Sequence, residues 1–241
     1  MQVKSFFRTK TLVSLVMSSV LVLSGCASTG SSMATHSADT RLKNDSSAKF
    51  FNRSGYQACA VAAGVGVLAC LVSNSSNKAA CAIAVGVAAC GVAMGANYYL
   101  DDRRSKYANT TQRLQAMTKD VQDDTARVVQ RTNVAQRVIV DDKAKLAQIK
   151  RDMASKNINV EKAKKDLVGI DQNIAILNSD LKNMQVKVDA YKETAQKERQ
   201  DGAGNKVVAM EREIARMNQK VASLKAEVDA LYNQRSAITL G

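Results

Sequence analysis

The chain has 241 residues, with 35 lysines and arginines against 22 aspartates and glutamates, and a formal net charge of +13. It has no proline and no tryptophan, and aromatic residues make up only 4% of it. So few aromatic residues argue against the large packed core of a compact enzyme, and the lack of proline favours uninterrupted helices. The composition therefore predicts an all-α protein.

Residues 1–25 have the pattern of a secretory signal peptide. Basic residues precede an apolar stretch over 12–23, and the pattern ends in the four residues Leu23-Ser24-Gly25-Cys26. These four residues resemble the lipobox of bacterial lipoproteins. The resemblance implies cleavage before Cys26, diacylglycerol on its sulfur and a further acyl chain on its new amino group. The alternative is an ordinary signal peptide whose cysteine is not lipidated.

Two or more acyl chains hold a protein stably on a membrane, whereas one chain does not. Ala27, and not aspartate, follows the cysteine, which resembles outer-membrane lipoproteins under enterobacterial-type sorting. The resemblance implies an outer-membrane lipoprotein that faces the periplasm, and retention in the inner membrane stays open. Residues 26–55 are polar and rich in serine for most of their length. We interpret them as the lipidated cysteine and a flexible tether.

Residues 56–100 contain two runs of alanine, valine, glycine and cysteine around the polar turn SNSSNK at 73–78. As helices, the runs would be about 24 to 28 Å long, at the short end for crossing a bilayer. Small residues recur every three or four positions and so share one face. The pattern predicts a membrane-associated hairpin packed through Ala63, Gly66, Ala84, Ala88, Gly91 and Gly95. It resembles the glycine-zipper segments of envelope lipoproteins; the alternative is a soluble, buried hairpin.

Four cysteines lie in this hairpin, and an exported protein can oxidise them. Positions that face each other across the turn have numbers summing to about 151, which pairs Cys70 with Cys81 and Cys59 with Cys90. Cys81 and Cys90 are nine residues apart, so an ideal helix turns them to opposite faces, which counts against the second bond. The alternative is four small buried thiols. No Cys-x-x-Cys motif occurs, and we predict no metal site and no cofactor.

From residue 101 onward the sequence has the heptad pattern of a coiled coil. Apolar residues alternate by three and four over 160–191 and over 207–231, and the glycine-containing segment 201–205 separates the two series. Short connections make neighbouring helices antiparallel. We predict an elongated coiled-coil rod over 101–241, made of three antiparallel helices at about 100–154, 159–200 and 206–238.

The first of these helices has a polar stripe in its seam. Threonines recur every seven residues, at Thr111, Thr118, Thr125 and Thr132. Threonine hydroxyls can bond back to carbonyls of their own helix, so an intramolecular coiled coil tolerates such a stripe. The alternative is a groove for a partner helix, in which case the four threonines are candidate partner-docking residues.

The sequence has no glycine-rich phosphate loop, no HExxH and no GxSxG. We therefore predict a non-enzymatic envelope lipoprotein, a membrane-anchored scaffold or spacer that docks a protein partner, or itself, through its coiled coil. The 27 basic and 20 acidic residues of the rod also fit anionic envelope polymers; nucleic acid is not expected for an exported chain. Two alternatives are an oligomeric membrane assembly, as in a pore or secretion system, and a regulator of a periplasmic cell-wall enzyme.

Overall fold

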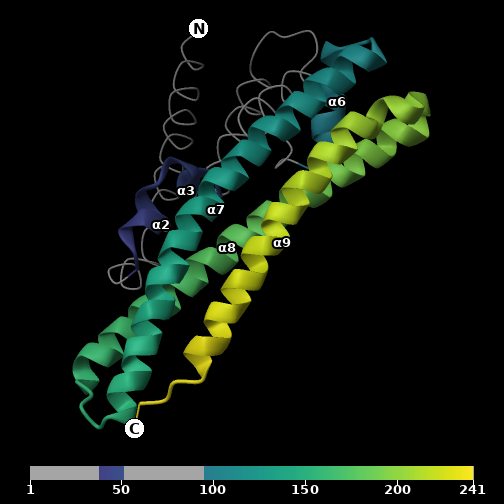
Figure 1. The fold of residues 1–241 in the computed structure, drawn as a ribbon. Coiled ribbons are helices and arrows are strands. Elements are labelled where there is room, and N and C mark those ends of the chain that lie inside the picture. Colours follow the sequence, from purple (N-terminus) through teal and green to yellow (C-terminus); the bar gives the residue numbers. More distant parts are fainter. Residues whose placement is uncertain (1–37, 52–94, 241) are drawn as a thin grey trace, which may run out of the picture. The chain divides into compact units, whose positions relative to one another are not determined.

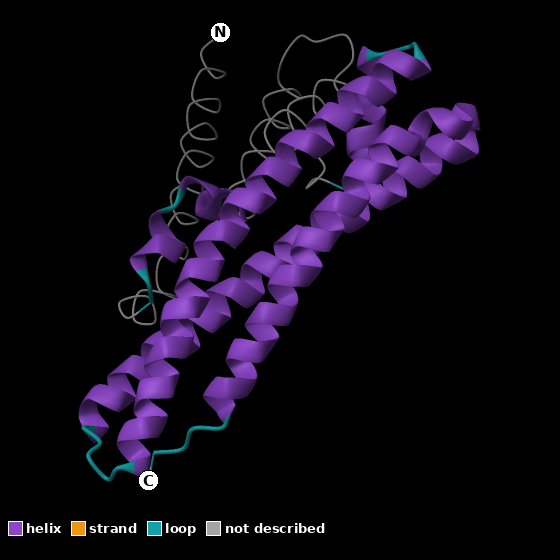
Figure 2. Ribbon diagram, in the orientation of Figure 1, coloured by secondary structure: helices purple, strands orange, loops and turns teal. Residues whose placement is uncertain are grey.

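The computed structural model describes residues 38–51 and 95–240 (Figure 1). Within these residues the chain is helical and has no strand, as Figure 2 shows, so the all-α prediction is confirmed for them. The longest helices are α7 (Thr110–Ala154), α8 (Val160–Glu198) and α9 (Val208–Ser236). Among the described residues, the shorter helices α2 (Thr40–Asn44), α3 (Ser46–Phe51) and α6 (Ala96–Lys106) precede them.

An asparagine fixes where α7 begins. The Asn109 side chain accepts hydrogen bonds from the backbone N–H groups of Thr111 and Gln112. Such a cap satisfies donors that the first turn of a helix leaves free. The heptad pattern predicts one helix over about 100–154, but the backbone is extended at Tyr107 (φ −131°, ψ 93°) and Asn109 then starts a new helix. The predicted helix is therefore divided into α6 and α7.

The other two long helices lie where the sequence places them. The ends of α8 and α9 fall within two residues of the predicted bounds. Asn159 caps α8 by accepting a hydrogen bond from the backbone N–H of Lys162. In the link from α8 to α9, Gly202 and Gly204 have φ of 91° and 53°. Glycine adopts this left-handed region without steric penalty, and this explains the predicted break at 201–205.

The apolar seam joins α9 to both of its neighbours. Because short links connect them, α8 runs antiparallel to α7 and α9, and the predicted antiparallel packing is confirmed. The predicted seam residues of α9, together with the seam residue that precedes it, are all buried: Val207, Met210, Ile214, Met217, Val221, Leu224, Val228 and Leu231. On α8 the predicted series is buried from Ala163 onward, whereas Val160 is 40% exposed. Full burial of such a side chain stabilises by about 1.5–3 kcal/mol.

Residues 38–51 are not a free tether. Instead they form α2 and α3, which pack on the long helices with Leu42, Ala48 and Phe51 at most 1% exposed. Asp39 caps α2, because its side chain accepts a hydrogen bond from the backbone N–H of Arg41. The apolar residues within a serine-rich stretch give these two helices a face to bury. Any tether from Cys26 therefore ends before residue 38.

Several predicted features lie outside the described residues. These are the signal peptide, Cys26, the hairpin cysteines Cys59, Cys70, Cys81 and Cys90, and the packing residues Ala63, Gly66, Ala84, Ala88 and Gly91. Gly95 is described, and it precedes α6 with φ of 102°. Glycine adopts this positive φ without steric penalty, and the hairpin residues against which Gly95 is predicted to pack lie outside the described residues. No helix within 38–51 and 95–240 is long and apolar enough to cross a bilayer.

Candidate functional site

The groove between α7 and α8 is filled by other segments of the chain. These two helices touch each other less than either touches α9. Residues 38–51, called the strap here, lie along this groove on α7 and α8, and α6 covers it further along. Figure 1 shows α2 and α3 on one side of α7 and α9 on the other. The groove differs from the apolar seam because charged and amide side chains cross it.

At the middle of the groove, Arg131 of α7 meets Asp180 of α8. Arg131 is fully buried, its Nε donates to Asp180 Oδ2 at 2.8 Å, and its Nη2 donates to the carbonyl oxygen of Leu42 in the strap at 2.8 Å. Burial raises the pKa of Asp180 to about 6, although the Arg131 charge opposes the shift. The guanidinium therefore ties both helices to the strap.

One end of the strap is held by an amide. Asn173 of α8 donates from Nδ2 to Asp142 Oδ2 of α7 at 2.7 Å. Its Oδ1 accepts a hydrogen bond from the backbone N–H of Asp39, also at 2.7 Å. Both Asn173 and Asp142 are buried. On the rim beside them, Arg41 of the strap pairs with Asp141 of α7 at 2.7 Å. This end of the strap is thus positioned by a hydrogen-bonded chain across both helices.

The other end of the strap meets a cluster around Asp124 of α7. Asp124 Oδ2 pairs with the buried Lys187 ammonium and accepts a hydrogen bond from the Tyr191 hydroxyl at 2.8 Å. The Lys187 Nζ lies 4.3 Å from the centre of the Phe50 ring of α3, within cation–π range. Tyr191 packs edge-on against Tyr99 of α6, with ring centres 5.7 Å apart. We call Phe50, Tyr99, Asp124, Lys187 and Tyr191 the root cluster.

The root cluster joins two distant parts of the chain. Phe50 lies near the end of the strap and Tyr99 lies in the first turn of α6, so residues from both sides of the segment 52–94 belong to one cluster. The burial that lowers the pKa of Lys187 also raises the pKa of Tyr191. The neighbouring Asp124 carboxylate favours the charged lysine and the protonated tyrosine. Aromatic packing and one shared carboxylate therefore hold both ends of this segment.

A second polar group secures α6 beside the root cluster. The Tyr99 hydroxyl donates to Asp120 Oδ2 at 2.5 Å, and Arg103 pairs with the same carboxylate at 2.9 Å. Burial raises the pKa of both Tyr99 and Asp120. At the far end of α6, the buried Glu198 carboxylate accepts from Arg104 at 3.1 Å. Helix α6 is thus fixed at both of its ends.

The predicted threonine stripe lies mostly inside the bundle. Thr125 and Thr132 are buried, Thr118 is half-buried and only Thr111 is exposed. The hydroxyls of Thr118 and Thr125 donate to carbonyls one turn back in α7, at 2.7 Å each, as expected for an intramolecular seam. The four threonines therefore do not form an open docking groove for a partner helix.

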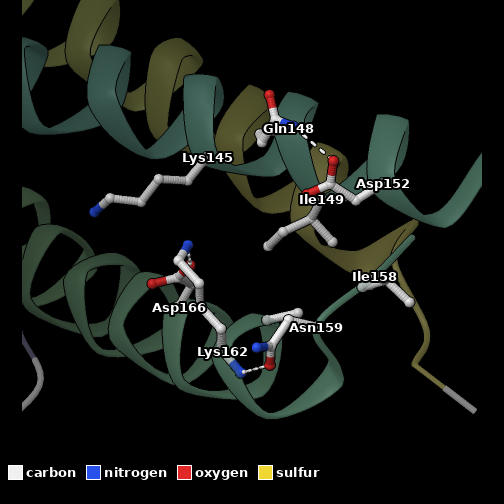
Figure 3. A pocket seen from close by; sticks show the side chains of 9 residues that line it. Lys145, Gln148, Ile149, Asp152, Ile158, Asn159, Lys162 and Asp166 are labelled. Atoms are coloured by element: carbon white, nitrogen blue, oxygen red, sulfur yellow. Dashed lines mark hydrogen bonds and ion pairs between the residues drawn. The ribbon is translucent and has the colours of Figure 1, made fainter. Parts of the chain in front are cut away.

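A small cavity lies where α7 ends and α8 begins (Figure 3). Its volume of about 130 Å³ is below the usual range for a small-molecule site. Charged groups on its wall are paired with near neighbours: Lys162 with Asp166 at 2.8 Å, and Gln148 with Asp152 at 2.6 Å. Among the described residues, no group of three or more His, Cys, Asp or Glu side chains is placed to bind a metal ion.

The polar groove was missed at the sequence level although it has a repeat. The polar residues Asn173, Asp180, Lys187 and Thr194 recur every seven positions, and all four are buried. Each stands three residues after an apolar seam residue of α8: Ile170, Leu177, Met184 and Tyr191. A polar heptad beside an apolar heptad indicates a second buried face. The adjacent acidic and basic residues of this helix resemble a solvated face, and they hide the repeat.

Comparison with models of protein families, with curated proteins and with solved structures finds no match to this chain. A proposal for its function therefore rests on its own residues and on the geometry of the groove.

Proposed function

We propose that the chain is a non-enzymatic lipoprotein of the bacterial envelope, and that its helical bundle is a scaffold for other envelope components. Acyl chains on Cys26 and the apolar segment within 52–94 attach it to the outer membrane, and the bundle faces the periplasm. The observation that carries this proposal is the root cluster. In this cluster, residues on both sides of a segment rich in alanine, valine, glycine and cysteine pack against α8 of a water-facing bundle.

The burial pattern of the long helices supports separate roles for the bundle and for the membrane attachments. The long helices bury their apolar seam against one another. The predicted seam residues of α9 and nearly all of those of α8 are buried. The regular three-and-four spacing of this burial supports a coiled coil, the finer form of the fold that we propose. We propose that the apolar segment within 52–94 is buried in a bilayer and not in that core.

Lipidation is tested by following radiolabelled palmitate in growing cells. We expect the wild-type chain to incorporate the label, and Cys26→Ser to lose it because the acceptor sulfur is gone. Cys59→Ser is the matched control, since it removes another cysteine of the exported chain and leaves the lipobox unchanged. A label that persists in Cys26→Ser, or that never appears in the wild type, would refute the lipoprotein assignment.

The contribution of the apolar segment is tested by replacing residues 56–94 with a short Gly/Ser linker. A short linker suffices because both ends of the segment lie at the root cluster. We expect the variant to keep the helical circular dichroism of the bundle. Combined with replacement of residues 1–26 by a cleavable signal peptide that has no lipobox, this change is expected to release the bundle into the aqueous fraction. A double variant that folds and still requires detergent would show that the bundle itself holds the membrane.

The scaffold role calls for a protein partner. Because the threonine stripe is not an open groove, we place docking on the outer surface of the bundle, where Tyr232 of α9 is 58% exposed. A photo-crosslinking amino acid at position 232 in living cells is expected to capture another envelope protein. Capture of a second copy of this chain alone would favour the oligomeric assembly, and capture of nothing would remove α9 as the docking surface.

A further inference from the structure

We infer that the bundle lies along the membrane surface, with the strap, α6 and the adjoining sides of α7 and α8 towards lipid and with α9 facing away. This inference rests on the proposed function, because it takes the lipidated end and the apolar segment as the membrane attachments. It concerns the surface that meets the phospholipid, which membrane attachment alone does not specify.

Three described residues mark where the chain leaves the bundle for these attachments. They are Ala38, which follows the tether, Phe51, which precedes the apolar segment, and Gly95, which follows it. All three belong to the strap or to the start of α6, and these segments contact α7 and α8. These contacts place the attachments on the α7 and α8 surfaces that the strap and α6 cover, whereas α9 packs on the same two helices through the apolar seam.

The three departure points are spread along α8 and not gathered at its end. The backbone of Asp39 is bound by Asn173, the carbonyl of Phe51 accepts from Asn183, and Asn97 of α6 meets Lys197. From Asn173 to Lys197 the helix rises about 36 Å at 1.5 Å per residue. A bundle standing on one end would hold these points at very different heights above the membrane.

One upright orientation places the end of α8 at the membrane. Ala38 would then stand at the level of Asn173, about 38 Å above Glu198. The twelve residue steps from Cys26 to Ala38 span about 40 Å when fully extended. The serine-rich sequence of these residues predicts a flexible chain, whose relaxed span at that length would be only about 20 Å. This orientation therefore requires a nearly taut tether.

The opposite upright orientation places the start of α8 at the membrane. The root cluster, at the level of Tyr191, would then stand about 46 Å above Val160. The apolar run over 79–97 continues directly into α6 at Gly95, with no polar linker between them. Its last residues would be held far from lipid. Only a bundle lying on its strap side brings all three departure points within reach without stretching any segment.

The chain offers a matched pair of positions for testing this orientation. Val168 and Val186 of α8 are 50% and 45% exposed. Eighteen residues separate them, which is five helical turns, so they face the same way about 27 Å apart. Val186 lies between Asn183 and Lys187, both of which contact the strap. The chain has no tryptophan, so a single introduced tryptophan reports on one position alone.

The experiment uses the full lipidated chain, reconstituted in vesicles of phosphatidylethanolamine and phosphatidylglycerol. A fraction of the lipid carries a nitroxide on its headgroup, which quenches nearby tryptophan emission. The variants Val168→Trp and Val186→Trp are compared with Tyr232→Trp on α9. We expect the two α8 variants to lose a similar, large share of their emission and Tyr232→Trp to lose little.

Each other result has a definite meaning. Strong quenching of Val186→Trp with none of Val168→Trp, or the reverse, would show an upright bundle and overturn the inference. Quenching confined to Tyr232→Trp, or absent from all three variants on chains that float with the vesicles, would overturn it as well. Chains that do not float with the vesicles would instead refute the proposed membrane attachment. The two proposals therefore fail in different ways.

Discussion

The two buried faces of α8 are built in different ways. Towards α9, residues such as Leu177 and Met184 are fully buried and close a seam by apolar contact alone. Towards α7 and the strap, Asp180 and Lys187 are just as deeply buried but are paired with charges on α7. The apolar seam adds stability in proportion to the area that it buries. We expect the polar groove to add less net stability, and we propose that it specifies which segment lies in it and in what register.

The largest expected effect comes from leaving one charge of the groove without its partner. Asp180→Leu removes the carboxylate that faces Arg131, and we expect a loss of about 3–5 kcal/mol of unfolding free energy. The double variant Arg131→Met/Asp180→Leu is expected to recover most of this loss, because an apolar pair can replace a buried ion pair. Urea unfolding of the full chain in mild detergent measures both. A double variant as unstable as the single one would refute the assigned pairing.

The apolar seam responds to loss of volume instead. Leu224→Ala deletes a fully buried side chain of α9, and we expect a loss of about 2–5 kcal/mol from lost burial and the cavity left behind. Val168→Ala, at an exposed position of α8, is the control and is expected to change stability by less than about 0.5 kcal/mol. Equal effects at the two positions would show that α9 does not provide the core.

The groove, unlike the seam, is expected to respond to pH. The pKa of Asp180 is about 6 in the folded chain against 3.8 for the free group, so the folded state binds this proton more tightly. Protonation of Asp180 therefore contributes to the free energy of unfolding. This contribution is complete below pH 4, amounts to at most about 3 kcal/mol, and disappears as the pH rises through 6. Asp180→Asn is expected to remove this part of the pH dependence. A wild-type chain that loses stability from pH 7 to pH 5, relative to Asp180→Asn, would contradict the shift.

The smallest effect concerns the strap alone. Asn173→Leu removes the acceptor for the backbone N–H of Asp39 and the donor to Asp142. We expect amide exchange in residues 39–44 to become faster, because the free energy of local opening falls by about 1–3 kcal/mol. Exchange in α9 is expected to stay unchanged. Gln185→Leu, at a half-buried position of α8, is the control. Faster exchange in α9 as well would show that the strap and the seam form one cooperative unit.

The contrast between the faces explains what the sequence could predict. Apolar residues at steps of three and four identify the seam of α9, and the glycines at 202 and 204 identify its start. The strap was not predicted, because Leu42 and Phe51 stand among serines and charged residues and have no period of their own. Its helices depend on caps such as Asp39 and on the groove that receives them. Such contacts exist only once α7 and α8 are in place.

The candidate site was harder to predict than the fold. Arg131 and Asp180 are 49 residues apart, and each belongs to a charge pattern that also suits a solvated face. Phe50 contacts Lys187, and Tyr99 packs against Tyr191. Lys187 and Tyr191 share the Asp124 carboxylate, which is distant in sequence from all four residues. The threonine stripe was recognisable, but its direction into the bundle follows from the packing of α7. Spacing in the sequence predicts which residues lie on the same face of a helix. Only tertiary contacts determine which of these faces is buried against another helix.

The central claim, that this bundle is anchored to a membrane from its amino-terminal half, is tested most directly by extracting isolated cell membranes. We predict that the mature chain stays in the membrane pellet through washes in high salt and leaves it only in detergent. Release of the folded chain by high salt alone would contradict the claim.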